Sequence, residues 1–405
     1  MKLWKKEGAA MDGRVERFTV GNDHLLDLAL VEHDCVASLA HARMLASIGV
    51  LTGDELAGIQ AGLAEIRALA AEGRFEIRAQ DEDCHTAIEG YLTEKLGDAG
   101  KKIHTGRSRN DQVLTALLLY EKARLAAIRG ALEDYRLALE EAISAHGDAA
   151  MPGYTHMQRA MPTTVAVWLG SFAAATVDDL RMLDGAVDLI DQCPLGTAAG
   201  FGVPVLALDR AMTTRELGFA RTMENPLYAQ LSRGKFEAVV IGLCSQLLYG
   251  PNRLASDLDL FATSEFGFVR LHESVCTGSS IMPQKRNPDV LELVRARYHV
   301  VLGEEVKVKS MMANLMSGYH RDAQLTKEPL MRALDETEAC LRIMPVVLRG
   351  MTVDRARCAA ALTPELYATE KALELVARGI PFREAYRMAA TTAALKQATR
   401  SNGDR

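Results

Sequence analysis

The sequence is poor in aromatic residues and in the patterns that mark β-structure. Phe, Trp and Tyr together make up 5% of the 405 residues, and alternating Val/Ile/Thr runs joined by hairpin turns are almost absent. Alanine is abundant and favours helices, whereas aromatic and β-branched residues favour strands. The composition therefore predicts an all-α protein.

Cysteine is sparse and lacks the spacing of a structural site. The seven cysteines are scattered, their number is odd, and no Cys-x-x-Cys pair occurs. A disulfide framework or a zinc site is therefore not expected, and a reducing cytoplasmic compartment fits best. The zinc-protease, calcium-loop, Walker A and G-x-S-x-G patterns are also missing, so the sequence contains no recognisable metal or nucleotide motif.

An excess of positive charge and long apolar runs are missing too. The net charge is −6, without a domain-wide basic stripe, which argues against a nucleic-acid partner. No uninterrupted apolar run is long enough to span a membrane. Because the chain as a whole would repel an anionic substrate, local cations would have to collect it.

The apolar spacing predicts several helices that are unusually long. From about Asn110 to His146 there is no proline and one glycine, and apolar residues recur at helical spacing. A helix of this length would extend about 50 Å and needs a bundle to cover its apolar face. Similar segments are expected at about 163–191, 231–261 (with a kink at Pro251) and 288–315.

Shorter signals complete the predicted architecture. Thr52-Gly-Asp-Glu55 reads as a capping box before a helix that stops near Gly73. The length suggests two or three domains. We expect an N-terminal helical domain at 1–105, a central long-helix bundle at 106–345 and a short C-terminal helical domain at 346–405.

Five polar clusters interrupt the helical pattern, each at or near the end of a long helix. Ala, Leu, Glu and Lys would be expected there, so dense hydrogen-bonding side chains indicate function. The clusters are Asp81-Glu-Asp-Cys-His85, His104-Thr-Gly-Arg-Ser-Arg-Asn-Asp-Gln112, Gly153-Tyr-Thr-His-Met-Gln-Arg159, Thr277-Gly-Ser-Ser-Ile-Met-Pro-Gln-Lys-Arg-Asn-Pro-Asp289 and Tyr319-His-Arg-Asp-Ala-Gln-Leu-Thr-Lys327.

The fourth cluster, residues 277–289, combines hydroxyls, cations and an amide on a Gly- and Pro-punctuated loop. Ser279 could exchange a proton, and Lys285 could hold a carboxylate. Asn287 suits an N-cap and Pro288 the first position of the next helix, whose start offers free N–H groups to an anion. The cluster favours a mobile lid that closes on an anion; taken alone, it could equally be a solvated surface loop.

Two other clusters carry further candidates for chemistry. Arg107 and Arg109 supply two forked guanidinium groups, which suit two carboxylates. His156 could move a proton near neutral pH, and Glu292 could orient its imidazole and raise its basicity. Taken alone, His156 would more often be a structural residue and Glu292 a solvated helix residue; the polar neighbours of His156 favour a functional role.

The motifs resemble those of a known enzyme family. The loop Gly278-Ser-Ser-Ile-Met-Pro-Gln-Lys-Arg-Asn287 resembles the loop shared by the fumarase/aspartase superfamily, whose members make or consume fumarate by β-elimination. His104-Thr-Gly-Arg-Ser-Arg-Asn-Asp-Gln-Val113 resembles the version found in the argininosuccinate lyase family, which includes the δ-crystallins. Pro152-Gly-Tyr-Thr-His-Met-Gln-Arg-Ala160 and Pro381-Phe-Arg383 agree, so the resemblance covers nearly the whole chain.

The resemblance implies a fold, a reaction and an assembly. The expected fold is a long-helix bundle of the fumarase/aspartase type. The expected reaction is reversible cleavage of L-argininosuccinate to L-arginine and fumarate, the last step of arginine biosynthesis. The family forms homotetramers in which three subunits contribute to each active site, and it uses no metal and no organic cofactor.

The resemblance also implies roles for individual residues. Ser279 looks like the catalytic base and His156, paired with Glu292, like the other member of the acid–base relay, although which of the two abstracts the proton stays open. Lys285, also taken as catalytic, and Asn287 resemble groups that hold the developing aci-carboxylate. The other implied substrate contacts are Ser38, Asp83, His85, Arg109, Asn110, Thr155, Tyr319, Gln324 and Lys327.

Some features depart from the family pattern and keep alternatives open. His320 and Ala323 stand where the family usually has Asn and Leu, and the C-terminal domain is short. A fumarate-forming lyase for another N-succinyl compound is one alternative. A non-catalytic structural protein on the same fold, like the lens crystallins, is a second, and a plain helical scaffold is a third, but neither explains the retained polar clusters.

Overall fold

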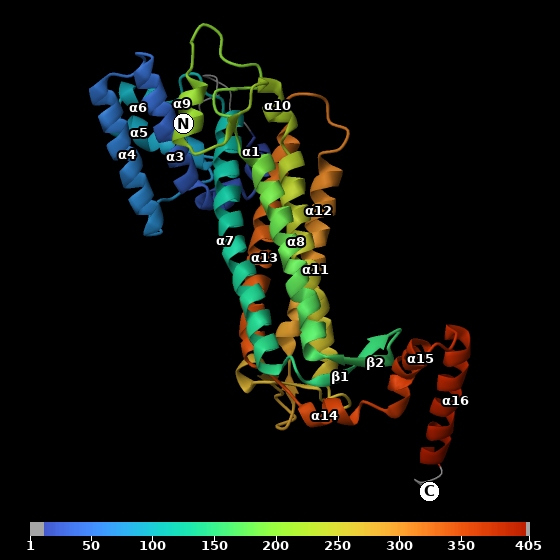
Figure 1. Cartoon of the computed structure of the whole chain (residues 1–405). Coiled ribbons are helices and arrows are strands. Elements are labelled where there is room, and N and C mark those ends of the chain that lie inside the picture. The colour runs from blue at the N-terminus through green and yellow to red at the C-terminus, as the bar shows by residue number, and fades with distance from the viewer. Residues whose placement is uncertain (1–11, 402–405) are drawn as a thin grey trace. The chain divides into compact units, whose positions relative to one another are not determined.

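The computed structural model describes residues 12–401, with side chains described as far as residue 391, and it is built from helices (Figure 1). Strands occur in the described part of the chain as short two-stranded pairs. The all-α prediction is therefore confirmed. Within the same residues, no helix is both long and apolar enough to cross a membrane.

The four predicted long helices are confirmed, with ends close to those expected: α7 (Arg109–His146), α8 (Val165–Ile190), α11 (Lys235–Phe261) and α12 (Asp289–Met311). The structure adds a long helix that was not predicted, α13 (Lys327–Arg349). The apolar face predicted for α7 forms core: Leu114, Leu118, Leu125, Ile128, Leu132, Tyr135 and Leu139 are buried. Helix α11 continues across Pro251, and a kink at that residue stays a prediction.

The chain forms two compact units, and each of the long helices contributes to both. Unit 1 comprises residues 1–129, 181–245 and 300–336; unit 2 comprises 130–180, 246–299 and 337–405. Both units are therefore discontinuous in sequence. The three-domain division at residues 105 and 345 stays a prediction.

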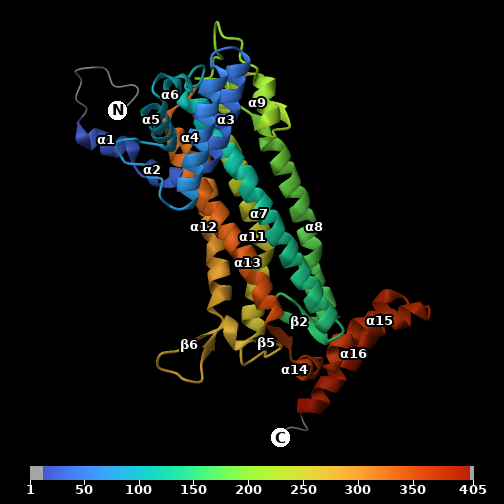
Figure 2. The ribbon, with the colours of Figure 1, turned by 90° about the vertical axis from the view of Figure 1, so that its left-hand side faces the viewer.

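Unit 1 contains the small N-terminal helices. Its elements are α1 (Gly13–Val20), α2 (Asp23–Leu26), η1 (Asp27–Ala29), α3 (Val31–Ser47), α4 (Gly53–Ala71), α5 (Cys84–Leu96), α6 (Asp98–Lys102), α9 (Arg210–Glu216), α10 (Pro226–Leu231), η3 (Arg321–Thr326) and the parallel pair β3 (Gln192–Cys193) with β4 (Arg221–Thr222). Helix α3 packs on α4 and α5, and α5 on α6 (Figures 1 and 2). At Gly100 an added Cβ would lie 2.4 Å from the Leu92 carbonyl oxygen, so only glycine permits the close approach of α6 to α5.

Unit 2 contains the remaining strand pairs and the C-terminal helices. Its elements are β1 (Ala150–Thr155), β2 (Gln158–Thr164), β5 (Val269–Leu271), η2 (Glu273–Val275), β6 (Thr277–Gly278), β7 (Arg286–Asn287), β8 (Met351–Val353), α14 (Arg355–Ala360), η4 (Pro364–Tyr367), α15 (Ala368–Ala377) and α16 (Phe382–Ser401). The antiparallel pairs are β1 with β2, β5 with β8, and β6 with β7.

The structure corrects two local predictions. Asn287 does not cap the helix that follows it. Asn287 belongs to β7 and pairs with Thr277 of β6, and α12 begins only at Asp289. The pairing at the two ends of the loop decides the backbone of Asn287, which a local cap preference cannot anticipate. The cluster around His156 lies on a β-hairpin, although the sequence showed almost no hairpin signals.

The predicted capping box of α4 is confirmed and gives a test of local stability. The Thr52 hydroxyl accepts from the Glu55 N–H at 3.2 Å, and the Glu55 carboxylate accepts from the Thr52 N–H at 2.9 Å. Thr52→Ala removes the first bond and should lower the free energy of unfolding by about 1 kcal/mol, measured by urea unfolding followed by circular dichroism. The exposed Gln60→Ala in the same helix should change it by less than about 0.5 kcal/mol, and equal losses would contradict the cap.

Candidate active site

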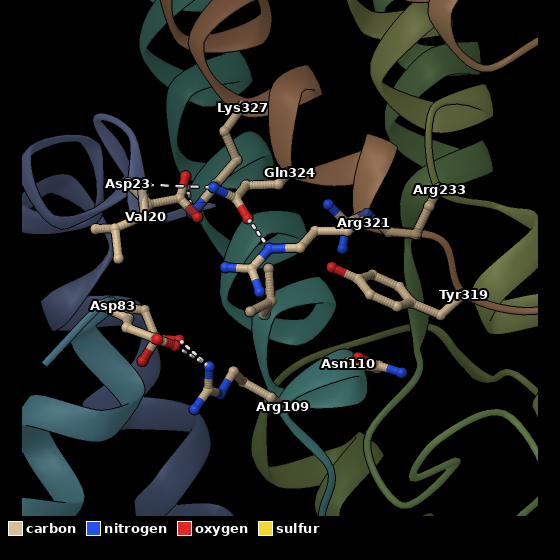
Figure 3. Close-up of a pocket in the computed structure, with 12 residues that line it drawn as sticks. Val20, Asp23, Asp83, Arg109, Asn110, Arg233, Tyr319, Arg321, Gln324 and Lys327 are labelled. Atoms are coloured by element: carbon tan, nitrogen blue, oxygen red, sulfur yellow. Dashed lines mark hydrogen bonds and ion pairs between the residues drawn. The ribbon is translucent and has the colours of Figure 1, made fainter. Parts of the chain in front are cut away.

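A polar pocket lies within unit 1, where the N-terminal helices meet the starts of α7 and α13 (Figure 3). Its volume is about 190 Å³. Cations and carboxylates both line it, so it suits a ligand that carries charges of both signs. The lining residues are Val20, Asp23, Glu82, Asp83, Arg109, Asn110, Val113, Arg233, Tyr319, Arg321, Gln324 and Lys327.

Lys327 is a buried cation of this pocket and pairs with two carboxylates. Its Nζ lies 2.6 Å from Asp27 Oδ1 and 2.9 Å from Asp23 Oδ1. Burial opposes the ammonium charge, but the two carboxylates outweigh burial and raise the pKa of Lys327. Burial also raises the pKa of Asp23 to about 6, although Lys327 acts in the opposite direction.

Arg109 is held on the opposite wall by two acidic side chains. Its Nη1 lies 2.9 Å from Glu82 Oε2 and 3.3 Å from Asp83 Oδ2. Asp83 is also the N-cap of α5 and accepts from the Thr86 N–H at 2.8 Å, which fixes its carboxylate. Burial opposes the charge of Arg109, but Asp83 and Glu82 outweigh it and raise the pKa of the guanidinium.

Two of the predicted substrate contacts lie behind the pocket wall and are fully or almost fully buried. Ser38 Oγ accepts from Arg107 Nη1 at 2.9 Å, and His85 Nδ1 lies 3.1 Å from Asp34 Oδ1. Burial opposes the charged imidazole, but Asp34 outweighs it and raises the pKa of His85. In this chain Ser38 and His85 support other side chains; direct contact with substrate stays a prediction for both.

Among the described residues, one group has the donor atoms of a metal site. Ligand atoms of Asp27, Cys84 and His85 lie within 4.8 Å of one another, and all three residues are buried. Asp27 already accepts from Lys327 and from the Cys84 N–H, and burial raises the pKa of the Cys84 thiol well above its usual range. The Lys327 ammonium thus supplies the positive charge that a metal ion would bring, and the group is better explained as a hydrogen-bonded ion network.

Sequence reasoning missed several acidic residues of this region, among them Asp23 and Asp27, which pair with Lys327. Glu82 lines the pocket with a positive φ of 70°, and no local signal marks that conformation. Asp111 is fully buried and accepts from the N–H groups of Ser108, Gly196 and Ala198, each at 2.9 Å. Asp111 therefore ties the start of α7 to the segment after β3, and burial raises its pKa to about 6.

In unit 2, His156 occupies the tip of the β1–β2 hairpin. The Thr155–Gln158 pair closes a two-residue turn in which φ is positive at both His156 (52°) and Met157 (59°). This backbone matches the type I′ turns of tight hairpins, which Asn and Gly usually occupy. Thr155 and His156 are exposed, so the hairpin presents the imidazole to its surroundings. Within the described chain no hydrogen bond joins His156 to Glu292, and their pairing stays a prediction.

The loop between β6 and β7, also in unit 2, holds Ser279 in a defined environment. Ser279 Oγ accepts from the N–H groups of Met282 at 3.1 Å and Ile281 at 3.3 Å. Hydrogen bonds donated to an oxygen favour its anionic form, so these two groups would stabilise a serine alkoxide. Lys285 and Glu292 are exposed, on the loop and in the first turn of α12 respectively.

The structure thus divides the predicted site residues between the two units. Asp83, Arg109, Asn110, Tyr319, Gln324 and Lys327 line the unit 1 pocket. Thr155, His156, Ser279, Lys285, Asn287 and Glu292 belong to unit 2.

Comparison with known proteins agrees with the resemblance seen in the sequence. A family model described as lyase matches residues 9–303. Over 389 residues the chain is 48% identical to the argininosuccinate lyase of Thermotoga neapolitana. The aligned residues cover 96% of this chain and 97% of that protein. The argininosuccinate lyase of Sorangium cellulosum is 48% identical over 98% of this chain and 91% of its own length.

The chain belongs to the argininosuccinate lyase family. It is accordingly an enzyme, a carbon–nitrogen lyase. A solved structure of EDDS lyase in complex with formate has the same fold, with a TM-score of 0.81 and 28% identity, covering 96% of this chain and 78% of that chain.

In this member of the argininosuccinate lyase family, the buried ion pairs of Lys327 should control stability. Lys327→Met would leave Asp27, fully buried, without its cation, and should cost about 3–5 kcal/mol of the free energy of unfolding. Lys327 also opposes the raised pKa of Asp23, so without the ammonium the Asp23 pKa should rise further. A carboxyl group whose pKa is raised in the folded state makes that state less stable as the pH increases. The cost of the substitution should therefore be larger at pH 8 than at pH 5.

Urea unfolding at the two pH values measures this cost. Lys101→Met is a matched control, because Lys101 is exposed and pairs with Asp98 on the surface. Its effect should stay within about 1 kcal/mol. A Lys327→Met variant as stable as the control at pH 8 would contradict the structural role of the ion pairs.

Proposed function

We propose that this chain cleaves L-argininosuccinate to L-arginine and fumarate by β-elimination, the last step of arginine biosynthesis. The observation that carries the proposal is the unit 1 pocket, which holds cations and carboxylates together. Arg109 pairs there with Glu82 and Asp83, and Lys327 pairs with Asp23 and Asp27. Argininosuccinate carries carboxylates and a guanidinium, so it needs binding groups of both signs. The identity to argininosuccinate lyases over nearly the full chain supports this choice of substrate.

Ser279 is proposed to remove the proton next to the succinyl carboxylate. The electron pair then forms the carbon–carbon double bond of fumarate while the carbon–nitrogen bond breaks. The N–H groups of Ile281 and Met282 favour the alkoxide that Ser279 needs in order to act as a base. The leaving group is already a cationic guanidinium at neutral pH and departs as neutral guanidine. An acid that protonates the leaving group therefore matters less than stabilisation of the carbanion.

Formation of the carbanion is the main barrier of the reaction, and two residues are proposed to stabilise its charge. Lys285 and Asn287 would hold the carboxylate as it takes up negative charge. Donors placed for such a charge are worth about 3–4 kcal/mol each. His156, oriented by Glu292, is proposed as the other member of the acid–base relay.

We further propose a homotetramer in which active sites are shared between subunits, in the cytoplasm. Apolar side chains are exposed along α8 and α12, among them Val167, Val177, Leu293 and Val306. Such surfaces are typical of subunit interfaces. Sharing would let the hairpin and loop of one subunit complete the pocket of another. The seven free thiols suit a reducing compartment.

A second candidate is elimination from another N-succinyl compound, favoured by the similarity to EDDS lyase. The protein is incubated with argininosuccinate and, side by side, with adenylosuccinate. Fumarate formed from each compound shows which of the two is a substrate. Fumarate from argininosuccinate alone supports the first proposal, and fumarate from neither compound contradicts it.

Replacement of the proposed base tests the mechanism. Ser279→Ala should reduce the rate of fumarate release by about 10²–10⁴-fold, because general base catalysis is lost. The rate is measured by ultraviolet absorbance, and circular dichroism and size-exclusion chromatography verify the fold and assembly. Ser274→Ala, an exposed serine ahead of the loop, should retain the normal rate. Near-normal turnover by Ser279→Ala would rule out its role as base.

Subunit mixing tests the shared sites. His156→Asn and Ser279→Ala should each lose most of their activity, since each lacks one member of the relay. Exchange of subunits between the two variants should restore part of the fumarate release, because some mixed sites would contain both native residues. Mass spectrometry of differently labelled subunits shows whether exchange has occurred. Proven exchange without recovered activity would count against sharing.

A further inference from the structure

Asp23 and Asp27 share the ammonium of Lys327 in unequal ways. Asp27 is fully buried and is held twice, by Lys327 Nζ at 2.6 Å and by the Cys84 N–H at 3.1 Å. The Asp23 side chain is 15% exposed, lines the pocket and lies 2.9 Å from the same Nζ. Asp27 is therefore the fixed partner of Lys327, and Asp23 is the partner that a ligand can reach (Figure 3).

A dicarboxylate that enters the pocket meets Lys327 already neutralised. Two carboxylates surround one ammonium, so this corner of the pocket carries a net negative charge at high pH. A ligand carboxylate must either displace Asp23 from Lys327 or lie next to it, and like charges this close repel each other strongly when water is partly excluded. The Asp23 carboxylate thus opposes the binding of anions at this point.

The charge of Asp23 changes within an accessible pH range. Burial raises its pKa to about 6, with Lys327 opposing this rise and Asp27 and Asp83 adding to it. Lys327 lies at the start of α13, Asp27 lies in η1, and Asp83 is the residue before α5. His24 is its neighbour in α2, and the other charged groups of the pocket are Glu82, Arg109, Arg233 and Arg321.

We propose that Asp23 is a positioning residue that competes with the substrate carboxylate for Lys327, so that loss of its charge strengthens the binding of dicarboxylates. The inference rests on the proposed function in taking this pocket as the substrate site. Asp23 acts through Lys327, and it raises the KM for an anionic substrate at alkaline pH. As the pH falls through the range where Asp23 takes up a proton, Lys327 becomes available to the ligand.

Calorimetric titration of the whole protein with fumarate tests the proposal without turnover. Asp23→Asn should bind fumarate about threefold to tenfold more tightly than the wild type at pH 8, because one opposing charge is gone. At pH 5 the two proteins should bind within about twofold of each other, because wild-type Asp23 is then mostly protonated. A difference that depends on pH in this way separates competition from a merely structural effect.

Two further variants serve as controls. Asp23→Glu keeps the charge and should bind fumarate more weakly than Asp23→Asn at pH 8. Glu94→Gln removes an exposed carboxylate on α5, about 16 Å along the helix from Asp83, and should bind like the wild type at both pH values. A tighter Glu94→Gln variant would mean that net charge alone explains the effect and would overturn the proposal.

The remaining outcomes are also decisive. Equal or weaker binding by Asp23→Asn at pH 8, or the same difference at both pH values, overturns the proposal. Should Asp23→Asn not fold, the wild type decides: its fumarate affinity should rise several-fold between pH 8 and pH 5, with a midpoint near pH 6, and a flat profile overturns the proposal. Turnover of argininosuccinate without this pattern refutes the inference alone, whereas the pattern without turnover refutes the proposed function alone.

Discussion

The ion pair between Lys327 and Asp27 joins parts of the chain that lie 300 residues apart, and the pocket depends on it. It fixes the start of α13 against the first helices. Gln324, on the turn before α13, adds to this attachment by donating to the Thr19 carbonyl at 2.9 Å. Two buried charges in contact must satisfy one another or one of them must lose its charge, so the sequence has little freedom at either position.

Much of the fold could be predicted because it follows from local patterns. The apolar face of α7 and the capping box at Thr52 are set by residues three or four positions apart, and the structure places them as expected. What could not be predicted depends on partners distant in sequence. Asp111 acts on backbone groups of the 195–198 segment, and Asn287 pairs with Thr277 across a loop. Neither partnership leaves a trace in the surrounding sequence.

The same distinction holds for the candidate site. Resemblance to a family supplied Arg109, Asn110, Tyr319, Gln324 and Lys327, which do line one pocket. It did not supply Glu82 or Asp23, whose importance comes from the charges that face them after folding. It also could not show that Ser279 Oγ receives two backbone N–H groups. A residue type at a motif position indicates a role, but the electrostatic environment that makes the role possible appears only in three dimensions.

The passage of the same long helices through both compact units has a consequence for dissection of the molecule. A gene fragment that encodes either unit would have to cut every one of α7, α8, α11, α12 and α13 in its interior. Each cut would create a new helix end with unsatisfied backbone N–H or C=O groups, and it would expose apolar side chains. Neither half is therefore suited to independent expression, and recombination between relatives should exchange whole helices rather than units.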